Sequence, residues 1–505
     1  MKLKVLLLLS GIFLLAYFLR ILFLPQNSLT FGYDQARDAV VSQEIVKGDF
    51  KILGPPSSTP GLYHGVFYYY FLAVPYAISK SPIVAAYWVA FWNTLTVFIV
   101  FALAWFLTRK ARAALLASIF FAVSWESTQY ATWLSNPTIG IWTVPLIYLG
   151  LWGWIKEKKL WGPALCGVGL GLSIQADIFL AYHLPPVLLW LWVARKNVSR
   201  NSTFLFAFSL IISISTLILS EIKFGFKGFS GVLHLATAQD AIVSSRGLGD
   251  FTVLFLNQIG KLFAFQTYPS NLGYGAGIVL VLIITALITW DRNQKISWEP
   301  FLATWLFSHI TVVTVGGTST PFLNVGTGPA VSILLGIMIY KWLQNKRVLA
   351  AALFLLVMVG NLSKTIKDNP RGSTIFAIQK DMLLSKQIAV IDYTYNNAGG
   401  NEFSINSVTS PLWINIVWAY LYDWHGNEKY GYTPTFHGKD QVGQVIALKT
   451  YEPTATNFLI IEPLAGIPPR FAQETISEED SRSSILEEKH WGELVVQKRK
   501  LGGLR

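Results

Sequence analysis

The sequence predicts an α-helical membrane protein that ends in a small soluble α/β domain. Of its 505 residues 53% are hydrophobic and only 13% are charged, whereas soluble domains carry about 25% charged residues. The apolar residues form long runs through residues 1–366, while residues 367–505 have an ordinary soluble composition. We therefore expect a transmembrane domain over 1–366 and a separate α/β domain over 367–505.

The apolar runs predict about eleven transmembrane helices. Each run approaches the length that crosses a hydrocarbon core of about 30 Å. The first run follows Lys2 and Lys4 without a small-residue cleavage site, which favours an uncleaved helix over a signal peptide. The predicted spans are residues 5–24, 83–107, 112–126, 138–155, 160–177, 179–194, 203–221, 276–290, 300–317, 323–342 and 347–366.

The cations between these runs predict the orientation of the helices. They lie in every second connection, as expected if those connections face the cytoplasm. The N-terminus is then cytoplasmic and the C-terminal domain extracytoplasmic, in the plasma (inner) membrane. This scheme requires that the aromatic-rich residues 63–80 do not cross the membrane but lie flat in its outer interface. Because the net charge of +12 is explained by topology, we expect no nucleic-acid partner.

Two outer segments are long, residues 25–82 and 223–275, and long segments beside a membrane bundle are usually functional. The first contains Asp34, Arg37 and Asp38, whose spacing places all three side chains on neighbouring positions of one helix face. A carboxylate held there against the bundle would have a raised pKa and suit a general base. The other interpretation is a helix start enriched in acidic residues.

A stiff loop rich in proline and glycine, residues 54–64, follows in the same outer segment. It ends at Tyr63 and His64, immediately before the aromatic segment. His64 is a candidate for binding a phosphate or a metal. The alternative is an interfacial histidine with an ordinary hydrogen bond.

The order of these features resembles the GT-C membrane glycosyltransferases of the protein O-mannosyltransferase and aminoarabinose-transferase type. Asp34-Gln-Ala-Arg stands where those proteins carry an Asp-Glu pair, and Leu62-Tyr63-His64 begins a stretch that stands where they carry Pro-Pro-Leu-Tyr-Tyr. Ser135-Asn136-Pro137 and Ser173-Ile-Gln175-Ala-Asp177 lie where related chains have polar motifs at outer helix ends. The resemblance covers the first 180 residues best.

The resemblance implies a GT-C-like bundle and an inverting transfer of a hexosyl or pentosyl group. The donor would be a sugar on a polyprenyl phosphate, and the acceptor a hydroxyl of a lipid, glycan or protein. By position, Asp34 would be the base that takes the acceptor proton. The sequence departs from the family at Gln35, where the second acid is expected, and Asp38 is the substitute one turn on.

Further residues are candidates for binding the substrates. Nearby cations would stabilise the charge of the leaving phosphate, and the outer candidates are Arg37, His64 and either Arg246 or Lys261. Related proteins often place a cation before a late span, but residues 320–329 contain none. Tyr63, in the Leu-Tyr element, and three polar residues at or near span ends complete the set of predicted substrate-binding residues: Asn136, Gln175 and Asp177.

The outer carboxylates also raise the question of a metal. Glu126 and Asp177 are predicted to reach the same side as Asp34, and oxygen ligands suit a divalent cation. The mannosyltransferase type needs no metal, so the resemblance implies no required cofactor, with a divalent cation as the alternative. The single cysteine, Cys166, lies in an apolar run and is interpreted as a buried core residue.

Two other functions remain open. A transporter or lipid flippase should show paired halves and charged, broken helices at mid-membrane, and no internal repeat is evident. A non-catalytic scaffold that keeps the fold is compatible with Gln35. In the C-terminal domain the pattern predicts helices over 376–396 and 411–424 and strands over 402–408, 457–461 and 493–497.

Overall fold

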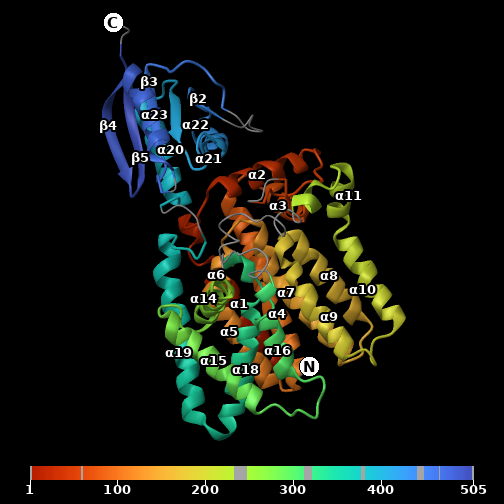
Figure 1. Ribbon diagram of the computed structural model, residues 1–505. Helices are drawn as coiled ribbons and strands as arrows, with labels where there is room; N and C mark the ends of the chain where they lie inside the picture. Colours follow the sequence, from red (N-terminus) through yellow and green to blue (C-terminus); the bar gives the residue numbers. More distant parts are fainter. Residues whose placement is uncertain are drawn as a thin grey trace. The chain divides into compact units, whose positions relative to one another are not determined.

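The computed structural model describes residues 3–57, 61–231, 247–311, 321–376, 381–440, 448–465 and 467–502. Contacts divide the chain into two compact units (Figure 1). Unit 1 comprises Met1–Leu22, Phe50–Phe71 and Tyr87–Lys367. Unit 2 comprises Phe23–Asp49, Leu72–Ala86 and Asp368–Arg505. Two short N-terminal stretches thus fold with the C-terminal part, and the predicted domain boundary after residue 366 stays a prediction.

Unit 1 is helical, and most of its helices overlap the predicted apolar runs. Its α-helices are α1 (Leu3–Ile21), α4 (Pro82–Thr108, beginning in unit 2), α5 (Ala111–Val123), α6 (Trp125–Ala131), α7 (Gly140–Ile155), α8 (Trp161–Ala176), α9 (Leu184–Val193), α10 (Arg200–Ser213), α11 (Ser215–Lys223), α14 (Leu248–Thr267), α15 (Leu272–Ile288), α16 (Trp298–Leu306), α18 (Gly328–Asn345) and α19 (Arg347–Asp368). Short 3₁₀ turns, η2 (Asn136–Ile139), η3 (Ile178–His183) and η4 (Pro321–Asn324), join some of them.

The predicted count of eleven spans is not confirmed. Within the described residues, four helical stretches are long and apolar enough to cross a membrane, and two bent pairs raise the number to six. The four are Leu3–Gln26, Pro82–Thr108, Asn136–Ile155 and Arg347–Arg371. Other predicted spans form helices that are too short, such as α5 with 13 residues. The number of membrane crossings therefore stays a prediction.

Helix α14 lies within the segment 223–275 that the sequence analysis treated as a long outer connection. It has 20 residues and forms one of the bent pairs with α15, at an angle of 90°. Polar residues such as Asn257, Gln258 and Lys261 interrupt its apolar pattern, which is why composition alone did not indicate a helix.

Helices α7 and α8 pack closely because small residues line their contact. A Cβ atom on Gly150 would lie 2.3 Å from the backbone nitrogen of Cys166, and one on Gly169 would lie 2.7 Å from that of Ile147. Such contacts let two helix backbones approach each other in an apolar surrounding. Cys166 is fully buried, as predicted. The contact fixes the end of α8, where Gln175 and Asp177 lie.

Unit 2 combines helices with a five-stranded sheet. Its helices are α2 (Tyr33–Val46), the second half of α3 (Phe67–Tyr76), α20 (Leu384–Ala398), α21 (Ile416–Leu421), the π-helical turn η6 (Tyr422–Gly426), α22 (Asn427–Tyr430) and α23 (Pro469–Arg482). Helix α3 falls inside the segment 63–80 that was predicted as interfacial. Its placement in a membrane interface stays a prediction.

The sheet has the strand order β2-β1-β3-β5-β4. The strands are β1 (Ser404–Val408), β2 (Thr435–Phe436), β3 (Thr456–Ile461), β4 (Ser483–Trp491) and β5 (Leu494–Leu501). Strand β1 is parallel to β2 and β3, and β5 is antiparallel to β3 and β4. Buried residues of β1, β3 and α23 form a core that includes Val408, Leu459 and Ala472.

The three strands predicted in this domain, β1, β3 and β5, are present. Strand β4 was not predicted because most of its side chains are exposed, so its hydrophobic pattern is weak. Helix α23 was not predicted because it is dominated by charged and polar residues. The second predicted helix begins later, at Ile416.

Candidate active site

Helix α2 begins at a backbone cap that explains the residue Gln35. Gly32 precedes the helix in an extended conformation, and its N–H donates a hydrogen bond of 3.0 Å to Oε1 of Gln35. A side chain that returns from the third helical position to the cap satisfies a donor that the helix itself leaves unpaired. Gln35 is buried. At the position where the resembling family carries a second acid, this chain carries a helix-capping amide.

Asp34, Arg37 and Asp38 form one charged cluster on the first turns of α2. Arg37 Nη1 donates to Asp34 Oδ1 at 2.7 Å, and its Nε and Nη2 donate to Asp38 Oδ1 at 2.9 and 2.6 Å. The Asp34 side chain is 56% exposed, that of Arg37 13% and that of Asp38 not at all. The three side chains share one helix face, as predicted. Asp34 lies at its exposed part and Asp38 at its buried part.

Asp38 is a buried acid with an unusual proton affinity. Burial, as the largest cause, and the neighbouring Asp34 raise the pKa of Asp38 from 3.8 to about 7, against the opposing effect of Arg37. Its second oxygen, Oδ2, has no hydrogen-bond partner among the described residues. A carboxyl group with a pKa near neutrality can hold or release a proton under ordinary conditions.

The segment that leads into α2 is held by the C-terminal part of unit 2. Phe31 N–H donates to the Met382 carbonyl at 3.0 Å, and Leu384 N–H donates to the Leu29 carbonyl at 2.8 Å. The Gln387 side chain donates to the Phe31 carbonyl at 2.7 Å. Backbone pairing between segments about 350 residues apart therefore fixes where the helix starts, which no local pattern predicts.

Tyr420 of α21 contacts the segment before α2 and also α2 itself. Its ring lies 5.4 Å from that of Phe31, and its hydroxyl donates to the Lys80 carbonyl and accepts from Gln43 Nε2 at 3.4 Å. Tyr76 of α3 also interacts with Tyr420 and is close enough to Asp38 for that charge to affect its pKa. Neither tyrosine was predicted to lie beside α2, because these contacts join segments that are far apart in the sequence.

In unit 1, His64 meets the residues at the end of α8. Its Nδ1 accepts a hydrogen bond of 3.3 Å from the Ile178 N–H and lies 3.5 Å from Asp177 Oδ1. Because Nδ1 acts as an acceptor, the neutral ring carries its proton on Nε2. Asp177 caps η3 by accepting from the Phe179 N–H at 3.0 Å, and its Oδ2 has no partner in the described part of the chain.

The structure brings three more predicted residues to this neighbourhood. The Gly65 N–H donates to the Gln175 carbonyl at 2.9 Å, and a Cβ on Gly65 would collide with Gln175. Gln175 also donates to Thr216 Oγ1 at 2.6 Å. Asn136 of η2 donates to the Ala176 carbonyl at 2.6 Å. Tyr63, next to His64, is 39% exposed.

Two predictions find no counterpart in the described residues. Arg246 lies outside them, so its proposed phosphate contact stays a prediction. In the ranges that the structure describes, no group of three or more His, Cys, Asp or Glu side chains is arranged to hold a metal ion. Glu126 is buried and accepts a hydrogen bond from Gln266 instead. The need for a divalent cation stays untested.

Arg20 is a buried cation that the sequence analysis did not single out, although a charged residue inside an apolar run is itself unusual. Its Nε donates to Asn93 Oδ1 at 2.6 Å, and its Nη1 donates to the carbonyls of Ala16 and Ala122 at 2.9 and 3.0 Å. Ala122 is at the end of α5, where carbonyl groups lack helical partners. Arg20 therefore has the contacts of a structural residue.

Two solved structures of ArnT from Cupriavidus metallidurans are similar to this chain. The apo structure has a TM-score of 0.61 and 12% identity, and the match covers 98% of this chain and 97% of that chain. The structure bound to undecaprenyl phosphate has a TM-score of 0.59 and 11% identity, and covers 99% and 98%.

A crystal structure of the Archaeoglobus fulgidus oligosaccharyltransferase in the apo form matches with a TM-score of 0.45 and 13% identity over 83% of this chain and 63% of that chain. This likeness is too weak to support a shared fold. No family model matches the sequence, and no curated protein matches it as a relative. The chain therefore has the fold of ArnT over nearly its whole length, which confirms the fold that the resemblance implied.

Proposed function

We propose that this protein is an inverting glycosyltransferase that moves a sugar from a polyprenyl phosphate to an acceptor hydroxyl. The observation that carries the proposal is the charged cluster of Asp34, Arg37 and Asp38 at the start of α2, in a chain with the fold of ArnT. Fold alone does not give function. The cluster adds an exposed carboxylate, a fixed cation and a buried acid with a pKa near 7.

The proposed reaction is a single displacement. The acceptor oxygen attacks the anomeric carbon, a new C–O bond forms, and the bond from that carbon to the phosphate oxygen breaks. The acceptor proton passes to a carboxylate, and polyprenyl phosphate leaves with the bonding electron pair. The protein must therefore supply a base for the acceptor and stabilise the charge of the leaving phosphate.

Asp34 is the better candidate for the base, and Asp38 for a positioning residue. A base must touch the acceptor hydroxyl, and only Asp34 of the two acids is exposed. Asp38 holds Arg37 through two hydrogen bonds to one oxygen. Arg37 in turn bonds Asp34 and fixes its orientation. The sequence left both acids as catalytic candidates, and their different exposure supports this division of roles.

In unit 1, His64 is the proposed donor to the phosphate group. Its Nδ1 is occupied by the Ile178 N–H, so Nε2 carries the proton that a phosphate oxygen would accept. Asp177, one oxygen of which has no partner among the described residues, is proposed to bind the substrates together with the neighbouring Tyr63, Asn136 and Gln175. One ArnT structure holds undecaprenyl phosphate, and we propose a carrier lipid of the same class for this chain.

The proposed setting is a membrane, with the reaction on its outer face. The apolar helices of unit 1 support membrane insertion, and the distribution of cations supports a cytoplasmic N-terminus. The acceptor is a hydroxyl of a lipid, glycan or protein.

The test is release of polyprenyl phosphate by the purified protein from an undecaprenyl-phosphate sugar, with lipid, glycan and peptide hydroxyl acceptors supplied. Asp34→Asn should lower the rate by about 100-fold or more, because a positioned base contributes roughly 10²–10⁴-fold. Asp49→Asn is the matched control, since Asp49 is an exposed carboxylate just beyond the end of the same helix. It should keep the wild-type rate.

Two results would contradict the proposal. Full activity of Asp34→Asn would remove Asp34 from the reaction. No release by the wild-type protein from donors carrying hexoses, pentoses and amino sugars would favour a scaffold or a transporter. A flux assay in vesicles would then separate those two.

A further inference from the structure

A pocket of about 720 Å³ lies at the β2 edge of the sheet in the C-terminal part of unit 2. Its volume is in the range of small-molecule sites, roughly 300–1,000 Å³. Two tyrosines, three threonines, one carboxylate and one ammonium group contribute to its lining. None of them belongs to the charged cluster on α2 or to the neighbourhood of His64.

One wall of the pocket is a rigid aromatic side chain. The Tyr432 ring packs edge to face against Tyr395 at 5.0 Å and Phe403 at 6.2 Å. Its hydroxyl donates to the Asn401 carbonyl at 3.2 Å, and its own carbonyl accepts from the Tyr395 hydroxyl. A ring held in this way loses little freedom when a ligand packs against it.

A second tyrosine comes from the segment that extends the sheet edge. The Phe436 N–H donates to the Lys449 carbonyl at 2.9 Å, and the Tyr451 N–H donates to the Phe436 carbonyl at 3.1 Å. These bonds fix residues 449–451 beside β2. The Tyr451 side chain remains 61% exposed, so its ring is available to a ligand.

The pocket also adjoins buried polar groups that lack protein partners. Thr435 lines the pocket, and its hydroxyl has no partner among the described residues. Thr435 is paired in register with Ser404, and Ser404 with Asn457. Asn457 is fully buried, and both polar atoms of its side chain are also unpartnered in the described part of the chain. Both donors and acceptors are therefore unused at this end of the sheet.

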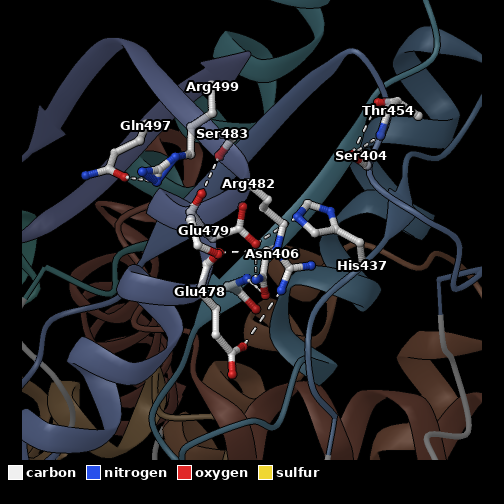
Figure 2. Close-up of polar contacts among 12 residues, drawn as sticks. Ser404, Asn406, His437, Thr454, Glu478, Glu479, Arg482, Ser483, Gln497 and Arg499 are labelled. Carbon is white, nitrogen blue, oxygen red and sulfur yellow. Dashed lines mark hydrogen bonds and ion pairs between the residues drawn. The ribbon is translucent and has the colours of Figure 1, made fainter. Parts of the chain in front are cut away.

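Thr454 connects the pocket to Ser404, which lies between Thr435 and Asn457 in the sheet. Its N–H and its hydroxyl lie 3.0 and 3.2 Å from Ser404 Oγ (Figure 2), and it lines the pocket as well. Ser404 thus contacts Thr454 of the pocket wall and is also paired in register with Thr435 and Asn457.

The charges of the lining select against ionic ligands. Glu402 and Lys449 both line the pocket, and neither forms an ion pair within the described ranges. One positive and one negative group give no net charge, so a phosphate would lack the surplus of cations that it needs. An ammonium ligand would meet Lys449 as well as Glu402. A neutral molecule with many hydroxyl groups can use both charged groups as hydrogen-bond partners.

We propose that this pocket binds a neutral carbohydrate. The apolar face of a sugar ring packs on the tyrosine rings, and its hydroxyls bond with Glu402, Lys449 and the threonines. The ligand is chemically distinct from a polyprenyl phosphate, and its binding does not depend on the proposed transferase activity.

The experiment measures binding of maltotriose, cellotriose and mannotriose to the full-length protein in detergent, by isothermal titration calorimetry, with inorganic phosphate as the ionic comparison. At least one trisaccharide should bind and phosphate should not. Tyr451→Ala should weaken the binding by about tenfold, because it removes an aromatic contact. Tyr451→Phe, which keeps the ring, should change it by less than about threefold. Glu402→Gln, also at an exposed position, tests the polar contacts and should weaken binding by about threefold to tenfold.

Each other outcome overturns the proposal. Binding of none of the three trisaccharides would show that the pocket is not a neutral-sugar site. Binding that is unchanged in both Tyr451→Ala and Glu402→Gln would place the sugar elsewhere. Binding of phosphate at this site would show that the balance of charge was misjudged. Because no variant here touches Asp34, Arg37 or Asp38, failure of this proposal leaves the transferase test unaffected.

Discussion

Unit 2 contains two buried carboxyl groups whose pKa values are shifted in opposite directions, Asp38 on α2 and Glu479 on α23. Both residues are at most 1% exposed. Burial raises the pKa of Asp38 to about 7, with one oxygen bonded only to Arg37 and the other unpartnered among the described residues. Burial also acts to raise the pKa of Glu479, but hydrogen bonds from His437 and Asn406 outweigh it, and the pKa falls below its ordinary value.

The difference shows that hydrogen bonds and neighbouring charges can outweigh the effect of burial on the pKa of an acid. Oε1 of Glu479 accepts from Asn406 at 2.7 Å and lies 3.0 Å from His437 Nε2 (Figure 2). The side chains of Asn406 and His437 therefore both stabilise the anionic form of Glu479. Asp38 depends on one cation that it shares with Asp34. The pKa of Glu479 therefore lies below its ordinary value, whereas that of Asp38 lies near 7.

The largest effect is expected for Glu479→Leu. The substitution leaves the buried donors of Asn406 and His437 unpaired, so the C-terminal part should lose about 2–4 kcal/mol of stability. Hydrogen exchange of strands β1 and β3 in the full-length protein measures this loss. Glu474→Leu on the same helix removes only a surface ion pair with Lys439 and should change stability by less than about 0.5 kcal/mol. Equal effects of the two variants would contradict a special role of Glu479.

The two acids should also respond to pH in opposite directions. The lowered pKa of Glu479 means that its stabilisation is present above its unfolded value of 4.5 and is lost as the pH falls below it. The raised pKa of Asp38 means that the folded state binds more protons between pH 3.8 and about 7, so its contribution to stability falls as the pH rises through that range.

Asp38→Asn tests the second of these directions. The amide resembles the neutral acid, so the variant should lose the decrease in stability between pH 4 and 7 and be at least as stable as the wild type at pH 8. Because Asp38 orients Arg37, the variant should also lower the transferase rate by about tenfold and flatten its pH profile near pH 7. Thermal unfolding and donor turnover across that range measure both. A wild-type pH profile in the variant would show that Asp38 has no part in the reaction.

The smallest effect is expected for Tyr420→Phe. It removes the hydrogen bonds to the Lys80 carbonyl and Gln43 and should cost about 1 kcal/mol of stability. Tyr422→Phe is the matched control, because its buried hydroxyl bonds Thr394 within the C-terminal part. Both variants should lose similar stability, but only Tyr420→Phe should lower the transferase rate. Equal rates in the two variants would show that Tyr420 does not position α2.

Features that follow from local spacing could be predicted from the sequence. Features that depend on contacts between distant segments could not. Spacing placed Asp34, Arg37 and Asp38 together, because three or four residues return a helix to the same face. It could not predict which acid is buried, since Asp38 owes its burial to tertiary packing. The contact of Tyr420 with α2 was not predicted for the same reason. Gln35 was interpreted only as a missing acid, although an amide three residues after a glycine also fits a helix cap.

The backbone bonds that join Phe31 to Met382 and Gln387 have a consequence for synthesis of the protein. A ribosome that adds about 5–20 residues per second needs roughly 20–70 s to make the intervening chain. During that time the start of α2 lacks these partners. The contacts that hold the start of α2 therefore form late in translation, and a chain that ends before residue 382 lacks them.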